Sequence, residues 1–160
     1  MDLPKSNFER MIQLAEDVFA VKNDPDQLDV NEEIIAHLKE IHPATVSEFD
    51  DGNGPVAWVL LIPTTTVLMH KFLHEEITEK QLYVMTPRSG MYEALYLCSA
   101  MVLEEYRRKG ITRRLVLEAI MRIREDHPLK ALFVWPFTKE GEQAAEAIAG
   151  MTSLTLHKHK

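Results

Sequence analysis

Residues 102–115, VLEEYRRKGITRRL, decide the fold of this chain and direct attention to one site. They follow an apolar run at 95–101 and open a helical pattern, so they predict a strand, a basic turn and a helix in that order. The start of such a helix offers unpaired backbone N–H groups and the positive end of a dipole. Five cations crowd the same place: Arg107, Arg108, Lys109, Arg113 and Arg114.

Cations at the start of a helix are locally unfavourable, by about 0.3–1 kcal/mol each when they are exposed. Five of them make sense if an anion lies in the turn, and a phosphate is the obvious candidate. Gly110 would let the backbone approach that anion closely because it has no side chain. The alternative is a solvated basic helix start without a ligand.

Residues 107–112, RRKGIT, resemble the Arg/Gln-x-x-Gly-x-Gly/Ala signature of the GNAT superfamily of N-acetyltransferases. Glu105-Tyr106-Arg107 also matches that family's usual approach to the turn, whereas Thr112 departs from the small last residue of the signature. In the family this turn wraps the pyrophosphate of acetyl-CoA. The resemblance therefore implies acetyl-CoA as cosubstrate, held by the strand end and the turn: Met101, Val102, Leu103, Arg107, Arg108, Lys109, Gly110, Ile111, Thr112 and Arg113.

The composition of the chain sets broad limits on its class. A length of 160 residues suits one domain spanning 1–160, and 46% hydrophobic with 27% charged residues is ordinary for a globular protein. The net charge of −7 argues against a nucleic-acid partner. A lone cysteine, Cys98, rules out an internal disulfide framework, and we find neither a signal peptide nor an apolar run of membrane-spanning length. We therefore expect a cytoplasmic protein without a membrane partner, and the sequence leaves open whether it forms a homodimer.

The periodicity predicts an alternation of helices and strands. Ser6-x-x-Glu9 reads as a capping box for a first helix that stops at residues 23–25, and Asn31 caps a second helix that ends at Pro43. Further helices are expected at 66–82, 111–124 and 138–149, and Gly150 stops the last of them. Strands are expected at 44–49, 56–62, 92–103, 131–135 and 152–156. A turn at 50–54 joins the first two strands. This order predicts an α/β fold, a three-layer domain with a mixed sheet. It resembles the order of elements in the GNAT fold, so the resemblance implies a GNAT-like three-layer α/β/α domain. The resemblance implies that the sheet splays centrally, between the strands at 92–103 and 131–135.

The chemistry of acyl transfer needs a way to remove a proton from the amine. Glu93 lies near the start of the long strand, where several GNAT members carry a catalytic Glu, and alternation places it beside Leu95 and Leu97. An apolar setting would raise its pKa, so Glu93 is the candidate base, although a solvated strand-edge Glu is the alternative. The tyrosine acid of many members is missing: residues 143–149, QAAEAIA, contain none, and Gly150-Met151 replaces the usual Gly-Phe pair.

Three further patterns are weaker. His70 and His74 stand four residues apart, yet no third ligand is evident, and we expect no metal. The helix expected at 66–82 carries Glu75, Glu76 and Glu79 on a polar side that could form one wall of an acceptor pocket for a cationic amine. Residues 157–160, HKHK, are expected to be a disordered polar terminus.

The resemblance implies an acyl-CoA-dependent N-acyltransferase that transfers an acyl group, most simply acetyl, to the primary amine of a small molecule or a protein by direct attack in a ternary complex. The alternative is a catalytically silent CoA-binding or partner-binding module on the same fold, which the missing tyrosine favours. An unrelated phosphate ligand is a third possibility, but the chain lacks a Gly-x-x-x-x-Gly-Lys pattern.

Overall fold

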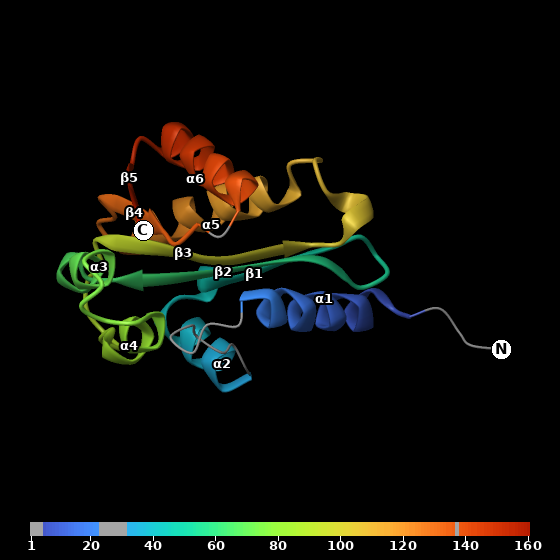
Figure 1. Ribbon diagram of the computed structural model, residues 1–160, viewed down its shortest axis with the longest axis horizontal. Helices are drawn as coiled ribbons and strands as arrows, with labels where there is room; N and C mark the ends of the chain where they lie inside the picture. The colour runs from blue at the N-terminus through green and yellow to red at the C-terminus, as the bar shows by residue number, and fades with distance from the viewer. Residues whose placement is uncertain (1–4, 23–31, 137) are drawn as a thin grey trace.

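The computed structural model describes residues 5–22, 32–136 and 138–160 of the chain. Within these ranges a mixed five-stranded sheet lies between two layers of helices (Figure 1). The strands follow one another across the sheet in chain order: β1 (Val46–Asp50), β2 (Pro55–Thr64), β3 (Ala94–Val102), β4 (Ala131–Val134) and β5 (Thr155–Lys158). The first three strands pair antiparallel and the last three pair parallel, which confirms the expected mixed α/β sheet.

Each face of the sheet is covered by its own set of helices. On one face lie α5 (Ile111–Asp126) and α6 (Lys139–Thr152), and on the other lie α1 (Asn7–Lys22), α2 (Glu32–Ile41) and α4 (Glu79–Met85), with α3 (Thr66–Leu73) at the end of the sheet (Figure 1). Successive strand residues point to opposite faces, so each strand supplies both cores. Leu61, Leu95 and Leu132 pack toward α5 and α6, whereas Ile62 and Phe133 pack toward the helices of the other face.

Two local predictions are confirmed in atomic detail. The Ser6 hydroxyl accepts a hydrogen bond from the Glu9 backbone N–H at 3.1 Å and so caps α1, which is one half of the expected capping box. The Glu9 carboxylate accepts at 3.2 Å from the Ser6 hydroxyl, not from the Ser6 backbone N–H that the box requires. The Asp50 carboxylate accepts from the N–H groups of Gly52 and Gly54, at 2.7 and 3.1 Å, and closes the turn between β1 and β2. The expected stop at residues 23–25 and the expected cap at Asn31 lie outside the described residues.

The single helix expected at 66–82 is wrong, because the segment forms two helices. α3 ends at Leu73, and Glu75 adopts a left-handed φ of 61° that no α-helix can contain. Thr78 then starts α4 with a capping box shared with Gln81. Glu79 is only 4% exposed, so it does not belong to the acidic outer wall that we expected.

Several element ends also differ from the prediction. The first strand, expected from residue 44, begins at Val46 because Pro43–Thr45 form a 3₁₀ helix. α6 runs through Gly150 to Thr152 and ends at Ser153, which takes the left-handed conformation with a φ of 60°. The last strand therefore begins at Thr155 and includes His157 and Lys158, so a disordered terminus at 157–160 is wrong. β3 spans Ala94–Val102, which leaves Glu93 outside the strand. In the part of the chain described here, no helix combines the length and the apolar character needed to cross a lipid bilayer.

Candidate functional site

The sheet opens between β3 and β4. The two strands pair only from Ala94 to Tyr96 against Ala131 to Phe133, after which β4 ends at Val134 and Pro136 follows. β3 continues to Val102, so its residues 97–102 have no strand partner on the β4 side among the described residues. A proline at this point suits the divergence, because it offers no ladder donor.

A β-bulge lies where the two strands separate. Leu61 of β2 pairs with Leu97 and Leu60 pairs with Ser99, so Cys98 is an extra residue in β3. A bulge bends its strand and increases the local twist. The bulge begins directly after Tyr96, the last β3 residue that pairs with β4, and it therefore favours the separation of β3 from β4.

The edge of β3 that faces this gap presents backbone hydrogen-bonding groups. The Leu103 N–H donates to the Val56 carbonyl at 2.9 Å, so Leu103 turns toward β2. Val102 turns the other way, and its carbonyl accepts from Arg107 Nε at 3.4 Å. Antiparallel pairing alternates along a strand, so Ala100 also turns its N–H and carbonyl toward the gap. Such an edge can pair with an extended chain that lies in the gap.

The gap leads into the basic turn that the sequence singled out. Beyond β3, the short 3₁₀ helix η2 (Glu104–Tyr106) precedes Arg107, and α5 starts after Gly110. Arg108 and Gly110 are left-handed, with φ of 65° and 74°. The left-handed Gly110 followed by the right-handed helical Ile111 is the alternation that aims successive N–H groups in one direction, as in an anion nest.

Gly110 itself leaves room in front of these N–H groups. Among the described residues, no side chain caps α5 at Gly110, and apart from residue 110, its chain neighbours and the adjoining backbone of α5, no heavy atom lies within 4 Å of the position that a Cβ of residue 110 would take. The first N–H groups of α5 have no partner within the helix. The Cβ side of Gly110 is therefore open to an approaching anion.

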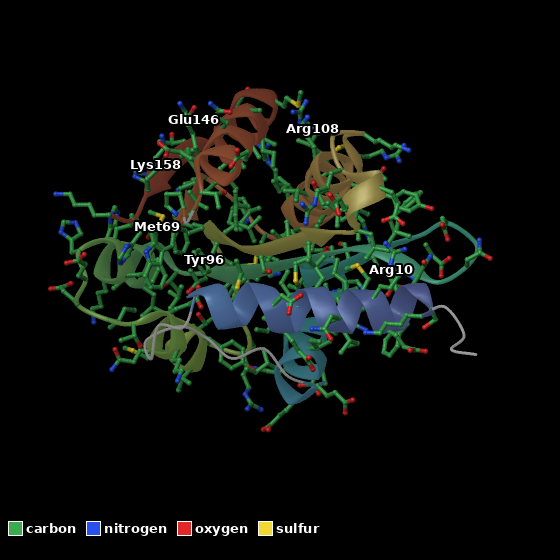
Figure 2. The ribbon with its side chains drawn as sticks, turned by 45° about the vertical axis from the view of Figure 1, so that its right-hand side comes forward. Arg10, Met69, Tyr96, Arg108, Glu146 and Lys158 are labelled. Atoms are coloured by element: carbon green, nitrogen blue, oxygen red, sulfur yellow. The ribbon has the colours of Figure 1, made fainter. Side chains whose placement is uncertain are left out.

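The cations of the turn are all exposed. Two of them lie over aromatic rings: Lys109 Nζ is 5.5 Å from the centre of the Tyr106 ring, and Arg114 Cζ is 5.7 Å from that of Phe49. Arg108 extends from the turn beyond the end of β3, whereas Tyr96 lies within the sheet (Figure 2). Exposed cations around unpaired N–H groups make this turn a favourable place for a phosphate.

Contacts that are distant in sequence hold the turn in place. Arg10 Nη2 of α1 lies 2.6 Å from Glu105 Oε1, and the Tyr106 hydroxyl donates to the Asp51 carboxylate. The hydrogen bond from Arg10 lowers the pKa of Glu105, and the one from Tyr106 lowers the pKa of Asp51. Sequence reasoning missed Arg10 and Asp51, because no local pattern relates them to the turn.

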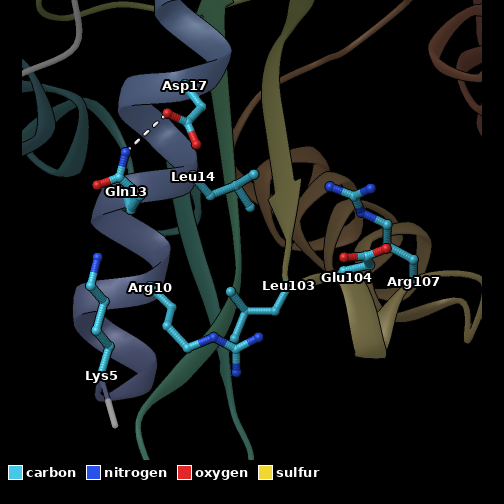
Figure 3. Close-up of a pocket in the computed structure, with 8 residues that line it drawn as sticks. All are labelled: Lys5, Arg10, Gln13, Leu14, Asp17, Leu103, Glu104 and Arg107. Carbon is cyan, nitrogen blue, oxygen red and sulfur yellow. Dashed lines mark hydrogen bonds between the residues drawn. The ribbon is translucent and has the colours of Figure 1, made fainter. Parts of the chain in front are cut away.

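A cleft of about 260 Å³ adjoins the turn on the α1 side (Figure 3). Arg10 extends across it from α1 toward Leu103, and Arg107 lies on the opposite wall. The walls carry both signs of charge, and the lining residues are Lys5, Arg10, Gln13, Leu14, Asp17, Leu103, Glu104 and Arg107. A ligand bound at the turn would thus have a polar cleft beside it.

The structure places Glu93 away from this site. Glu93 precedes β3, its side chain is 41% exposed, and its carboxylate lies 3.5 Å from Lys130 Nζ. The apolar setting that we expected for it is therefore wrong. Leu97, where the gap begins, is four residues further along, or about 13 Å at a rise of about 3.3 Å per residue. The role of Glu93 as the base stays a prediction.

His70 and His74 have ring centres 6.3 Å apart. No group of three or more His, Cys, Asp or Glu side chains in the described part of the chain is arranged to hold a metal ion. Comparison of the sequence with models of known protein families found no match. Comparison with curated proteins found no match either. The functional assignment therefore depends on the chemistry of the turn and the gap.

Proposed function

We propose that this chain is an acyl-CoA-dependent N-acyltransferase of the GNAT type, which transfers an acetyl group from acetyl-CoA to a primary amine in a ternary complex. One observation carries the proposal. The turn at residues 107–113, with its exposed cations and unpaired N–H groups, follows η2 directly after residues 97–102 of β3, which have no strand partner on the β4 side among the described residues. A ligand with a pyrophosphate at one end and an extended amide-containing arm at the other fits this combination.

The residues present suit the two parts of such a ligand. The N–H groups around Gly110 and the cations Arg107, Arg108, Lys109 and Arg113 would hold the pyrophosphate, with Ile111 and Thr112 supplying N–H groups at the helix start. The free edge of β3 spans five residue steps, about 17 Å at a rise of about 3.3 Å per residue. The backbone groups that turn toward the gap, at Ala100 and Val102, would pair with the arm as an added strand does. Met101 and Leu103, which the resemblance also implies, turn their backbone groups toward β2 instead.

Acetyl-CoA supplies a thioester carbonyl that an amine can attack. The role of the chain is then chiefly to hold the two reactants together, which can contribute about 7–11 kcal/mol. A lysine-like amine has a reference pKa of about 10.4, and its deprotonation at pH 7 costs about 4–5 kcal/mol. A proton acceptor near the thioester is therefore useful. The net charge of −7 weakly favours cationic acceptors.

A catalytically silent CoA-binding module is the second candidate. The observation that favours it is the absence of tyrosine from α6, where many GNAT members carry their acid. Both candidates need the turn and the gap. Turnover of acetyl-CoA in the presence of primary amines separates them.

Binding of acetyl-CoA tests what the two candidates share. We expect acetyl-CoA to raise the thermal midpoint of the wild type, because a ligand at 100 times its Kd stabilises the folded state by about 2.7 kcal/mol. The double variant Arg108→Gln/Arg113→Gln should lose most of that shift. Arg88→Gln/Arg122→Gln is a control with the same change in net charge, and it should keep the shift. An absent shift in the wild type, or an undiminished one in Arg108→Gln/Arg113→Gln, would overturn the proposal.

A further inference from the structure

The outer edge of β1 has no strand partner among the described residues, because β1 comes first in the order of the sheet and β2 pairs with its inner edge only. Backbone hydrogen bonding shows which way the residues of β2 turn. The Leu103 N–H donates to the Val56 carbonyl at 2.9 Å, so Val56 turns toward β3. Antiparallel pairing alternates along a strand, and Ala57 and Val59 therefore turn toward β1.

The register between β1 and β2 then decides which residues of β1 face outward. Phe49 and Ser47 lie opposite the two β2 residues that turn toward β1, so their N–H and carbonyl groups are directed at β2. Val46 and Glu48 direct theirs away from the sheet. An unpaired row of this kind is a template for another strand.

A groove of about 250 Å³ lies between this outer edge and α5, and its lining residues are Val46, Ser47, Glu48, Leu115, Glu118, Ala119 and Arg122. The four residues from α5 follow the i, i+3, i+4, i+7 spacing of one helix face. Leu115 and Ala119 pack toward the core, whereas Glu118 and Arg122 are exposed. Neither Glu118 nor Arg122 forms an ion pair with any residue in the described part of the chain. The α5 wall thus offers an apolar floor and one exposed charge of each sign.

We propose that this edge and groove bind a second copy of the chain, with β1 pairing antiparallel to β1 of that copy across a two-fold axis perpendicular to the sheet. The inference does not depend on the proposed function. With the axis at Ser47, Val46 of each copy lies opposite Glu48 of the other. These are the residues whose backbone groups face outward, and each such pair exchanges two hydrogen bonds. The outward groups of both strands are then satisfied.

The charges of β1 select this register. An axis at Glu48 would place the two Glu48 side chains directly opposite each other, and like charges in that position are destabilising. An axis at Ser47 places two small hydroxyl side chains there instead. Ser47 points to the α5 face, because side chains alternate and Glu48, whose carboxylate accepts from the Trp58 indole at 2.8 Å, points to the other.

The charges of α5 are complementary under the same symmetry. The two-fold axis places α5 antiparallel to α5 of the second copy, on one face of the joined sheet. In an isologous contact residue i meets residue j while j meets i. Glu118 of each copy is then directed toward Arg122 of the other, and the small Ala119 between them lets the two helices approach. The exposed charges that lack a partner within one chain thereby gain one across the axis.

Sedimentation velocity over a micromolar concentration series tests this contact, and we expect the wild type to form a dimer. Glu118→Arg should raise the dimer Kd by about tenfold or more, because both cross-pairs become repulsive. Glu118→Arg/Arg122→Glu should restore the wild-type Kd. Glu125→Arg, the same charge change on α5 outside the groove, is the control and should leave the Kd unchanged. A wild type that stays monomeric throughout the series, or a swap that fails to restore association, would overturn the inference.

Ser47→Lys tests the strand pairing separately. It should abolish the dimer, because two ammonium groups would face each other at the axis. The thermal midpoint, measured below the wild-type dimer Kd, should stay close to that of the wild type and so show that the monomer still folds. A dimer that persists in both Ser47→Lys and Glu118→Arg would mean that the copies associate through another surface, and the inference would be wrong. If Ser47→Lys does not fold, the charge swap on α5 decides.

Discussion

Tyr96 donates its phenolic hydrogen to Glu79 Oε2 over 2.5 Å, and both side chains are buried. Tyr96 is also the last residue of β3 that pairs with β4, opposite Phe133, and its ring stacks on that of Phe133 with centres 5.0 Å apart. Burial and the neighbouring Glu79 raise the pKa of Tyr96, so the hydroxyl keeps its hydrogen. The contact ties α4 to the strand pair at the point where the gap closes.

Removal of this hydroxyl should weaken the fold. Tyr96→Phe leaves a buried carboxylate without one of its donors, and we expect the free energy of unfolding to fall by about 1–3 kcal/mol. Urea unfolding measures the change. Tyr106→Phe removes an exposed tyrosine–carboxylate bond to Asp51 and is the matched control, which should change stability less. Equal effects of the two substitutions would mean that the buried pair has no special role.

Acid should destabilise the protein through His127. Burial, and secondly the nearby His42, lower the pKa of His127 in the folded state. The unfolded chain takes up a proton near pH 6.5 while the folded ring stays neutral, so the free energy of unfolding should fall as pH drops below about 6.5. Urea unfolding at pH 7.5, 6 and 5 measures this dependence. His127→Gln should make the dependence shallower, and an unchanged slope would assign it to other groups.

The two left-handed residues of the turn should respond in opposite ways to substitution. Gly110→Ala forces a side chain into a φ of 74°, so the free energy of unfolding should fall by about 1–2 kcal/mol, and its Cβ should hinder the phosphate. Arg108→Gly relieves a φ of 65°, so stability should stay or rise while acetyl-CoA affinity falls with the lost cation. Urea unfolding and calorimetric titration measure the two quantities. Loss of stability in Arg108→Gly would show that its side chain, rather than its backbone, matters to the fold.

Local signals account for the parts of the fold that were predicted correctly. The Ser6 cap, the Asp50 turn and the order of strand, turn and helix around Gly110 each depend on residues within a few positions of one another. The two helices at 66–85 were missed because their apolar spacing runs on across the break at Glu75. Glu79 was placed on the wrong side because its partner, Tyr96, is seventeen residues away in sequence.

The candidate site likewise contains one part that the sequence predicts and other parts that it does not. The basic turn is a local pattern, whereas the gap and its bulge depend on how β3 pairs with two neighbours. Arg10 contacts Glu105 across 95 residues of sequence, and no periodicity relates the two. Outside the site, His159 was assigned to a disordered terminus because its place beside Trp135 follows only from the pairing of β4 and β5.

Amide NMR of the ¹⁵N-labelled chain during a titration with CoA tests the central claim most directly, because it reports the turn and the gap at once. The account predicts that the amide signals of residues 97–102 and 108–113 move together and saturate at one CoA concentration, while those of the β1 edge stay in place. Unmoved signals at both segments, or movement confined to other parts of the chain, would contradict it.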